Sequence, residues 1–334
     1  IRGFGSFGGS LIDLGLELGE GSSSAQGVQG NDYFTEMFPA FFLTAVEPSK
    51  VEVLKDGSEG GEAVVRVSGP AGSFISLVNT ITELVDPQQP VTFYVDYALS
   101  PGSQYLKIAV SVKNETQDEA TWGLAMPFGF ITLLGEGQRL FVPGKAGFDM
   151  RFHLEDVYAQ TGWGLDALPG EVTPMWATEG DGVSYAFVPG RSPNGNYLAG
   201  KPQYPTATQD SFLIPIASSS FLGTFYAKSP EKVPAGGSYS YTAYVFVGSG
   251  DVASVQQVIY DTEDSVPRPG GKTFAVREKT AYGTLSGHVR EERSLKPLSG
   301  VSIVLQNEKG EFWSQASTRK DGVYTAPLPP GTYT

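Results

Sequence analysis

Two long alternating segments joined by a short turn constrain this chain more than any other feature of its sequence. Residues 91–99 and 105–113, within PVTFYVDYALSPGSQYLKIAVSVKNET, alternate apolar and polar side chains on either side of Pro101-Gly102. A period of two is that of a β-strand with one buried face, and Pro-Gly favours a tight turn. The segments therefore predict two neighbouring antiparallel strands, the second ended by Asn114, in a wide sheet.

The same spacing recurs along most of the chain. KVEVLKDGSEGGEAVVRVSGP predicts a hairpin that turns at Asp56-Gly57, and SFLIPIASSSFLGTFYAK and GGSYSYTAYVFVGSG return to strand spacing. The 42 Gly and 23 Pro residues are consistent with many turns between short strands. Residues 149–170 are the least strand-like part of the chain. We therefore expect an all-β fold built from antiparallel sheets.

One short helix and one linker interrupt this pattern. The segment DVASVQQVIYDTE predicts the helix, because Asp251 can cap its first turn. Its apolar side would consist of Val252, Val255, Val258 and Ile259. The Pro/Gly-rich segment SVPRPGGKT follows at 265–273, and 334 residues exceed the usual single core of roughly 250–300. Two domains are expected, at residues 1–275 and 276–334.

Charge and composition exclude several classes of function. The net charge of −13 repels phosphate backbones, so nucleic acid is not expected as a partner. The absence of cysteine excludes disulfides, thiol nucleophiles and Cys-ligated zinc. No apolar run reaches the ~18 residues of a membrane-spanning helix. No cofactor is expected. The acidic turns DGSEGGE and DTEDS leave calcium as an alternative, but neither has EF-hand spacing and ordinary hairpin turns explain both.

The last part of the chain carries its most specific motifs. They are Gly287-x-Val289, Pro297-Leu298-Ser299-Gly300-Val301, Thr318 to Asp321-Gly322-x-Tyr324, and Leu328-Pro329-Pro330-Gly331-Thr332-Tyr333. Asp321-Gly322 predicts a positive-φ turn, and Tyr324 and Tyr333 would close the end of a small sandwich. The segment resembles the carboxypeptidase-regulatory-like (prealbumin-like) modules of exported bacterial proteins. Such modules carry one or two further strands, so the resemblance implies an immunoglobulin/prealbumin-like sandwich that is incomplete at Thr334 and belongs to a longer protein.

The larger region resembles, less specifically, the galactose-mutarotase-like β-supersandwich. The similar stretches are FYVDYALSPGSQYLKIAVSVKNET and VPAGGSYSYTAYVFVGSGDVASV. The order of supersandwich and regulatory-like module is similar to the N-terminal half of exported bacterial metallohydrolases of the polymerase-and-histidinol-phosphatase (PHP) type. Rhamnogalacturonan lyases have a similar arrangement. Both resemblances imply an extracellular, periplasmic or cell-surface location.

Candidate catalytic residues are few. The PHP-type metal site needs a cluster of His and Asp ligands, whereas this chain has two histidines, His153 and His288, in different predicted domains. The remaining candidate for acid–base chemistry on a sugar is His153 with Glu155 and Asp156. Arg151, two residues earlier, would share a strand face with His153. The alternative interpretation of this cluster is the solvated edge of a strand or loop, and we favour it.

Aromatic and polar residues in Gly/Pro-rich loops suggest carbohydrate binding. Rings can stack on the C–H faces of sugars, while neighbouring polar groups form hydrogen bonds with the hydroxyls. The candidate ligand-binding residues are Trp163, Trp176, Arg191, Tyr197 and Tyr204. The alternative is that these rings fill the core between two sheets.

These observations predict a non-catalytic, extracytoplasmic β-sandwich segment of a larger exported bacterial protein, with a carbohydrate-binding or scaffold role. Its partners would be carbohydrate or other domains of the same protein. One alternative is a polysaccharide-active enzyme, a lyase or a mutarotase-like protein, that uses His153. Another is a structural subunit of a surface layer or filament that assembles through the open terminal module, which a partner would complete by donating a strand.

Overall fold

The computed structural model describes thirteen segments of the chain. They are residues 34–41, 44–46, 49–73, 90–121, 128–134, 139–143, 148–151, 176–179, 183–189, 211–215, 221–226, 232–262 and 282–334. Within these ranges the chain forms strands β1 to β20 and a single helix, α4, and every pairing between named strands is antiparallel. The expected all-β, antiparallel fold is confirmed.

Fourteen strands join edge to edge in one continuous ladder. Its order is β10-β9-β11-β12-β16-β6-β5-β4-β2-β1-β8-β14-β13, with β3 paired to β4. The strands are β1 Phe34–Phe41, β2 Thr44–Val46, β3 Lys50–Asp56, β4 Ala63–Ser73, β5 Val91–Leu99, β6 Tyr105–Asn114, β8 Phe128–Leu134, β9 Arg139–Pro143, β10 Phe148–Arg151, β11 Trp176–Glu179, β12 Ser184–Pro189, β13 Ser211–Pro215, β14 Phe221–Tyr226 and β16 Ser238–Gly248. A separate short pair consists of β7 Ala120–Thr121 and β15 Lys232–Val233.

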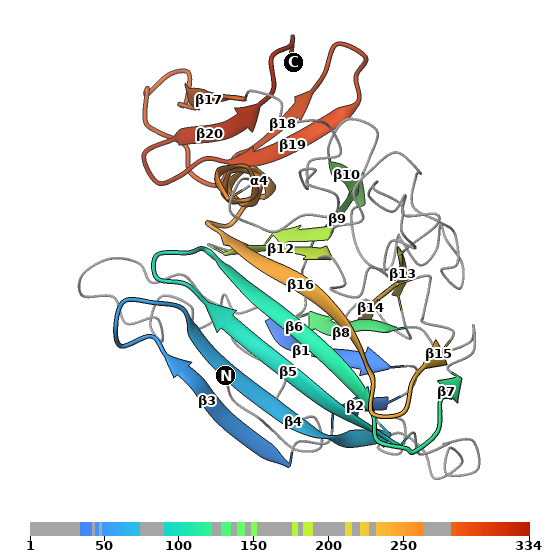
Figure 1. Ribbon diagram of the computed structural model, residues 1–334. Helices are drawn as coiled ribbons and strands as arrows, with labels where there is room; N and C mark the ends of the chain where they lie inside the picture. The colour runs from blue at the N-terminus through green and yellow to red at the C-terminus, as the bar shows by residue number, and fades with distance from the viewer. Residues whose placement is uncertain are drawn as a thin grey trace.

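Strand β4 connects the two parts of this ladder. It pairs with β5 as far as Pro70 and with β2 from Ala71 onward. In Figure 1 the long strands β3, β4, β5, β6 and β16 lie in front, and β1, β8 and β14 lie behind them. The buried side chains of the front strands include Val67, Phe93, Val95, Val110 and Val112, each exposed by 1% or less. Each such side chain stabilises the fold by about 1.5–3 kcal/mol relative to exposure.

The hairpins form where turn chemistry predicts them. Strands β5 and β6 flank Pro101-Gly102, where Gly102 has a φ of 71° and the Ser103 N–H donates to the carbonyl of Ser100 at 3.1 Å. Asn114 ends β6 as expected and is fully buried. Its amide donates to the carbonyls of Asp118 and Pro234, at 2.9 and 3.2 Å. Asn114 therefore fastens the turn after β6 to the turn before β16.

Helix α4, Val252–Asp261, is the helix that the sequence predicts. Asp251 caps it, because its Oδ1 accepts the N–H of Ser254 at 2.7 Å. One side of the helix packs on the ladder, as the apolar spacing indicates. The buried cluster there comprises Val252, Val255, Val258 and Ile259 with Phe141, Ala177, Ala186, Tyr244 and Phe246. At ten residues, α4 is much shorter than the ~20 that a bilayer-spanning helix needs. No other helix in the described ranges could cross a bilayer.

The last 53 residues form a small unit of two antiparallel strand pairs above α4 (Figure 1). Strand β17 (Gly283–His288) pairs with β20 (Val323–Leu328), and β18 (Ser302–Gln306) pairs with β19 (Phe312–Ser317). We call residues 282–334 the terminal module. The predicted Asp321-Gly322 turn is present, with a φ of 77° at Gly322. Tyr333 closes one end as predicted, packing edge-on to Trp313 with 6.3 Å between the ring centroids. The expected boundary at residue 275 lies outside the described residues.

Of residues 149–170, the least strand-like part of the sequence, the first three, Asp149–Arg151, belong to β10 and pair with β9. One local expectation was wrong. Trp176 does not lie in a loop but begins β11, opposite Phe187 of β12. In both cases pairing with an apolar neighbouring strand extends the ladder into sequence that lacks strand spacing of its own.

Candidate functional site

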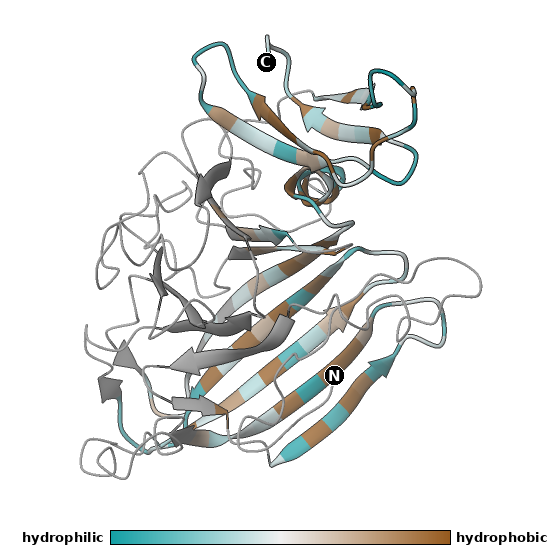
Figure 2. Ribbon diagram, turned by 180° about the vertical axis from the view of Figure 1, so that it is seen from behind, coloured by the Kyte–Doolittle hydropathy of each residue, from teal (hydrophilic) through white to brown (hydrophobic). Residues whose placement is uncertain are grey.

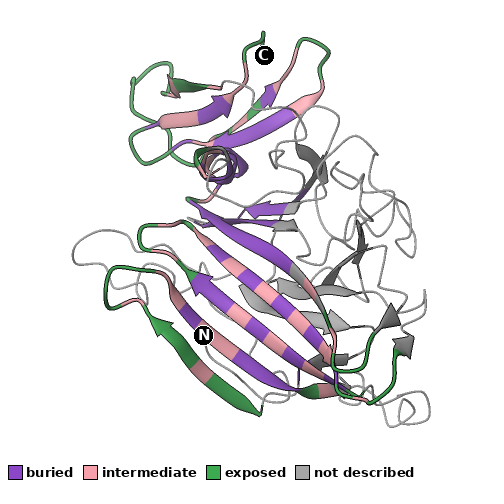
Figure 3. Cartoon of the chain, viewed as in Figure 1, coloured by how far each residue is buried: buried purple, intermediate pink, exposed green. Residues whose placement is uncertain are grey.

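One face of the front strands is polar and only half buried. Strands β5 and β6 alternate buried and intermediate residues along their length, as the bands in Figure 3 show. In Figure 2 the same strands alternate in hydropathy. The register places two cross-strand rows side by side on this face, in which Ser68 and Thr242 are buried and Lys50 is exposed. One row holds Glu52, Arg66, Asp96, Ala109 and Thr242, and the next holds Lys50, Ser68, Tyr94, Ser111 and Ser240. We call these ten residues the polar face.

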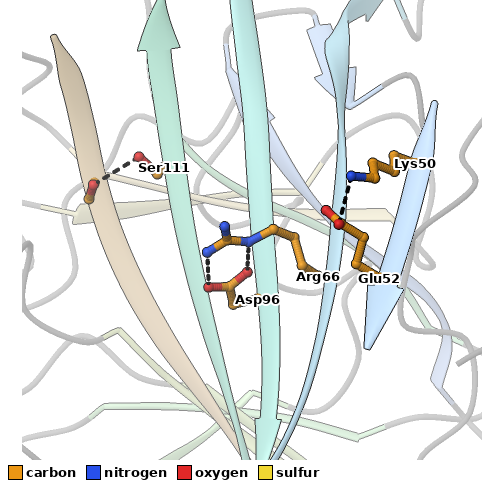
Figure 4. A network of polar contacts seen from close by, with 6 residues as sticks. Lys50, Glu52, Arg66, Asp96 and Ser111 are labelled. Carbon is orange, nitrogen blue, oxygen red and sulfur yellow. Dashed lines mark hydrogen bonds and ion pairs between the residues drawn. The ribbon is translucent and has the colours of Figure 1, made fainter. Parts of the chain in front are cut away.

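A paired arginine and carboxylate lie at the centre of the polar face (Figure 4). Arg66 of β4 donates from Nε and Nη2 to the two carboxylate oxygens of Asp96 of β5, at 2.6 and 2.7 Å. The Arg66 guanidinium also lies 5.6 Å from the centroid of the Tyr94 ring. The hydrogen bonds that Arg66 donates to Asp96 raise the pKa of Arg66 above its usual value. Two parallel bonds fix both side chains in one orientation.

Smaller polar contacts surround this pair. Lys50 and Glu52 form an ion pair of 2.6 Å on the edge strand β3, and Ser240 donates to the hydroxyl of Ser111 at 3.2 Å. Farther along β6, Lys113 donates to Glu115 at 2.9 Å. That bond raises the pKa of Lys113 and lowers the pKa of Glu115.

The polar face is suited to binding, and its two central charged groups are engaged with each other. Arg66 stays protonated at any ordinary pH, and Asp96 uses both oxygens to accept its hydrogen bonds. Of the two histidines, the structure describes His288, which lies exposed on β17 in the terminal module. Those ranges contain no cluster of three or more His, Cys, Asp or Glu side chains that could hold a metal ion. The face therefore offers fixed donors, acceptors and one partly exposed ring.

A second group of polar contacts joins the ladder to the terminal module. Asp251 caps α4 through Oδ1 and accepts the N–H of Ser317 of β19 through Oδ2, at 2.7 Å in both cases. Its side chain is buried, and burial raises the pKa of Asp251 above the usual 3.8 despite these hydrogen bonds. The Asp251 carboxylate thus caps the N-terminus of α4 and also accepts a hydrogen bond from β19 of the module.

Further contacts join β19 of the module to the sandwich and to α4. Gln315 of β19 donates to Oε1 of Glu179 of β11 at 2.7 Å, and Gln256 of α4 donates to the carbonyl of Trp313 at 3.3 Å. Phe312 stacks on Phe141, with 6.1 Å between the centroids. An apolar cluster fills the space on the module side of α4, and its buried members are Ala253, Leu305, Ala316 and Ala326. Helix α4 is therefore buried on two sides, between sandwich and module (Figures 1 and 3).

Most of the residues that the sequence singled out as a site are not described by the structure. His153, Glu155, Asp156, Trp163, Arg191, Tyr197 and Tyr204 lie outside the described residues. Of Trp176 the structure describes the backbone, at the start of β11. Their roles stay predictions. Among the acidic turns, Asp56 of DGSEGGE accepts hydrogen bonds from the N–H and hydroxyl of Ser58, which lower its pKa and fold the turn.

No protein-family model and no curated protein matches the chain. Among solved structures it is similar to the galactosidase domain of an α-galactosidase–sucrose kinase, with a TM-score of 0.40, 8% identity, and coverage of 68% of this chain and 29% of the other. It is also similar to a galactose mutarotase-like protein from Clostridium acetobutylicum, with a TM-score of 0.32, 9% identity, and coverage of 66% and 82%. A galactose mutarotase related enzyme from Lactobacillus acidophilus gives a TM-score of 0.30, 10% identity, and coverage of 60% and 72%.

Galactose mutarotase-like proteins are among its structural neighbours. At these identities and TM-scores the likeness transfers no ligand and no reaction to this chain. The matched part spans less than a third of the α-galactosidase–sucrose kinase chain.

Proposed function

We propose that this chain is a non-catalytic scaffold that holds its terminal module at a fixed angle on a large β-sandwich. The observation that carries the proposal is the buried junction, where Asp251 bonds both α4 and β19. Domains joined only by a linker move relative to each other unless their interface is large and apolar. Here a helix buried on two sides and polar bonds that cross the junction oppose such motion. In this proposal the module is of the prealbumin-like kind, and the parent protein is exported.

The fixed angle can be measured directly because the chain has no native cysteine. Single cysteines replace the exposed Lys55 of β3 and Lys309 of the module, and spin labels on both report the distance between the two parts. We expect one narrow distance distribution. Ala253→Arg places a charge in the apolar cluster and should broaden it, whereas Val51→Arg, at an exposed position of β3, should not. A broad distribution in the unsubstituted protein would refute the scaffold.

Carbohydrate binding is a second candidate function, and the polar face favours it. Sugar hydroxyls pair with ordered donors and acceptors, and sugar C–H faces pack on aromatic rings. The face supplies the Arg66–Asp96 pair, the Ser111 and Ser240 hydroxyls and the Tyr94 ring. Nothing in this arrangement requires catalysis.

A glycan array tests this second candidate. We expect the protein to retain a glycan and Tyr94→Ala to lose it. Lys55→Ala, at an exposed position of the edge strand outside the polar face, should leave binding unchanged. The same array should include Trp163→Ala and Trp176→Ala, because the sequence predicts that these rings bind the sugar. Binding that is lost in the tryptophan variants and kept in Tyr94→Ala would locate the sugar away from the polar face.

A further inference from the structure

One cation of the front strands differs from its neighbours in having no carboxylate partner. The paired cations of β3 to β6 are Lys50 with Glu52 at 2.6 Å, Lys55 with Glu62 at 3.5 Å, Arg66 with Asp96 at 2.6 Å and Lys113 with Glu115 at 2.9 Å. Lys107 of β6 is the remaining cation of these strands. Within the part of the chain that the structure describes, its ammonium forms no ion pair and no hydrogen bond.

The register places Lys107 on the same side of the sheet as the polar face. Lys107 lies opposite Ala98 of β5 and Tyr244 of β16, and the next residue on that side of β6 is Ala109 of the polar face. Tyr244 belongs to the buried cluster that packs on α4. Lys107 therefore lies one row beyond the polar face, at the end that is closer to the helix.

The surroundings of Lys107 leave its charge available to a ligand. Its side chain is half-buried, and Tyr105, two residues earlier on the same side of β6, is also half-buried and packs against the cluster at α4. The nearest carboxylate in the strand register is Asp96, on the adjoining row, and both of its oxygens accept hydrogen bonds from Arg66. Partial burial of a charge without a partner costs free energy, which an anionic ligand would offset.

We propose that Lys107 binds the anionic group of a sugar unit, a carboxylate or a sulfate, in a glycan that lies along the polar face. This inference rests on carbohydrate binding by that face, the second candidate function above. An ammonium is a compact point charge, so it pairs with either anion. Ala98, opposite Lys107, is four residues from Tyr94, or about 14 Å along the strand. A ligand that reaches both Lys107 and the Tyr94 ring is therefore an oligosaccharide, with its anionic unit at the α4 end.

The test is a glycan array that carries uronate and sulfated oligosaccharides beside their carboxyl-reduced and desulfated forms. We expect the unsubstituted protein to bind an anionic glycan about ten-fold more tightly than its neutral form. Lys107→Met keeps the apolar stem and removes the charge, so this preference should disappear while the neutral form binds as before. Lys107→Arg should keep the preference. Lys113→Met, on the same side of the same strand but in an ion pair, is the matched control and should also keep it.

The outcomes separate this inference from the function on which it rests. Equal binding of anionic and neutral forms, or a preference that survives Lys107→Met, would overturn the role of Lys107 and leave carbohydrate binding in place. The ammonium would then simply extend into water beyond its stem. No binding to any glycan would overturn both. A preference that depends on Lys107 supports the proposal, and the pair of glycans that shows it, uronate or sulfated, identifies the anion.

Discussion

At the scale of single residues, the terminal module depends on a glycine of its Gly287-x-Val289 motif. A Cβ at position 287 would lie 2.5 Å from ring atoms of Tyr324, so the ring of β20 rests on the bare backbone of β17. We expect Gly287→Ala to lower the free energy of unfolding by about 1–3 kcal/mol, because the ring must move. Urea unfolding followed by tryptophan fluorescence, to which Trp313 of the module contributes, measures this. In the background of Tyr324→Ala the same glycine substitution should cost much less.

A leucine of the module has a backbone conformation that favours glycine. Leu295 has a φ of 58° and is 65% exposed, so it holds a left-handed backbone without burying its side chain. Glycine adopts this conformation without the Cβ clash, although it costs more entropy on folding. We expect Leu295→Gly to raise the free energy of unfolding by about 0.5–1 kcal/mol in the same assay. Leu298→Gly, at a residue without positive φ, should lower it.

At the scale of elements, local chemistry explains what the sequence predicts well. Strands β5 and β6 follow from the two-residue period and Pro101-Gly102, and α4 follows from Asp251 and its apolar spacing. The register that places Asp96 opposite Ala109 does not follow from the turn, because a two-residue turn at Pro101-Gly102 would place Asp96 opposite Lys107. The pairing of β4 with β5, which brings Arg66 to Asp96, does not follow either, because residues 74–90 separate the two strands. The contact of Gln315 with Glu179, 136 residues apart, is equally invisible in the sequence.

The Arg66–Asp96 pair provides a test of the β4–β5 pairing. The two side chains are exposed by 34% and 24%, so solvent screens them in part. A double-mutant cycle with Arg66→Met and Asp96→Asn should give a coupling of about 1 kcal/mol, because the bond is bidentate. The coupling should fall at ~1 M salt. The more exposed Lys113–Glu115 pair serves as the control and should couple more weakly. A coupling of zero at low salt would contradict the register.

At the scale of the whole molecule, helix α4 packs on both the sandwich and the module. Helix α4 contributes one side to each core, so loss of the module would expose Ala253 together with Gln256, both buried. Neither core is complete without this helix. We therefore expect the described parts of the chain to unfold in one cooperative transition rather than two. Coincident urea curves from far-ultraviolet circular dichroism and from the fluorescence of a variant that keeps Trp313 as its one tryptophan would show it, and separated midpoints would contradict it.

The junction should also make stability depend on pH through Asp251. Burial raises the pKa of its carboxyl above 3.8 in the folded protein, so the folded state binds this proton more tightly than the unfolded state does. The corresponding stability is fully present below about pH 4 and is lost as the pH rises through the folded pKa. Asp251→Asn has no proton to lose. Like the protonated carboxyl, its amide has one carbonyl oxygen to accept the N–H groups of Ser254 and Ser317.

The difference in unfolding free energy between the unsubstituted protein and Asp251→Asn isolates this effect from other titrating groups. That difference should shrink as the pH rises from about 4 toward 7, because only the unsubstituted protein loses the contribution of a protonated Asp251. Urea unfolding at a series of pH values measures it. Asp321→Asn, at an exposed turn that caps Val323 outside the junction, is the control and should lack this trend. A difference that grows with pH would mean that the carboxylate is the form that the junction stabilises.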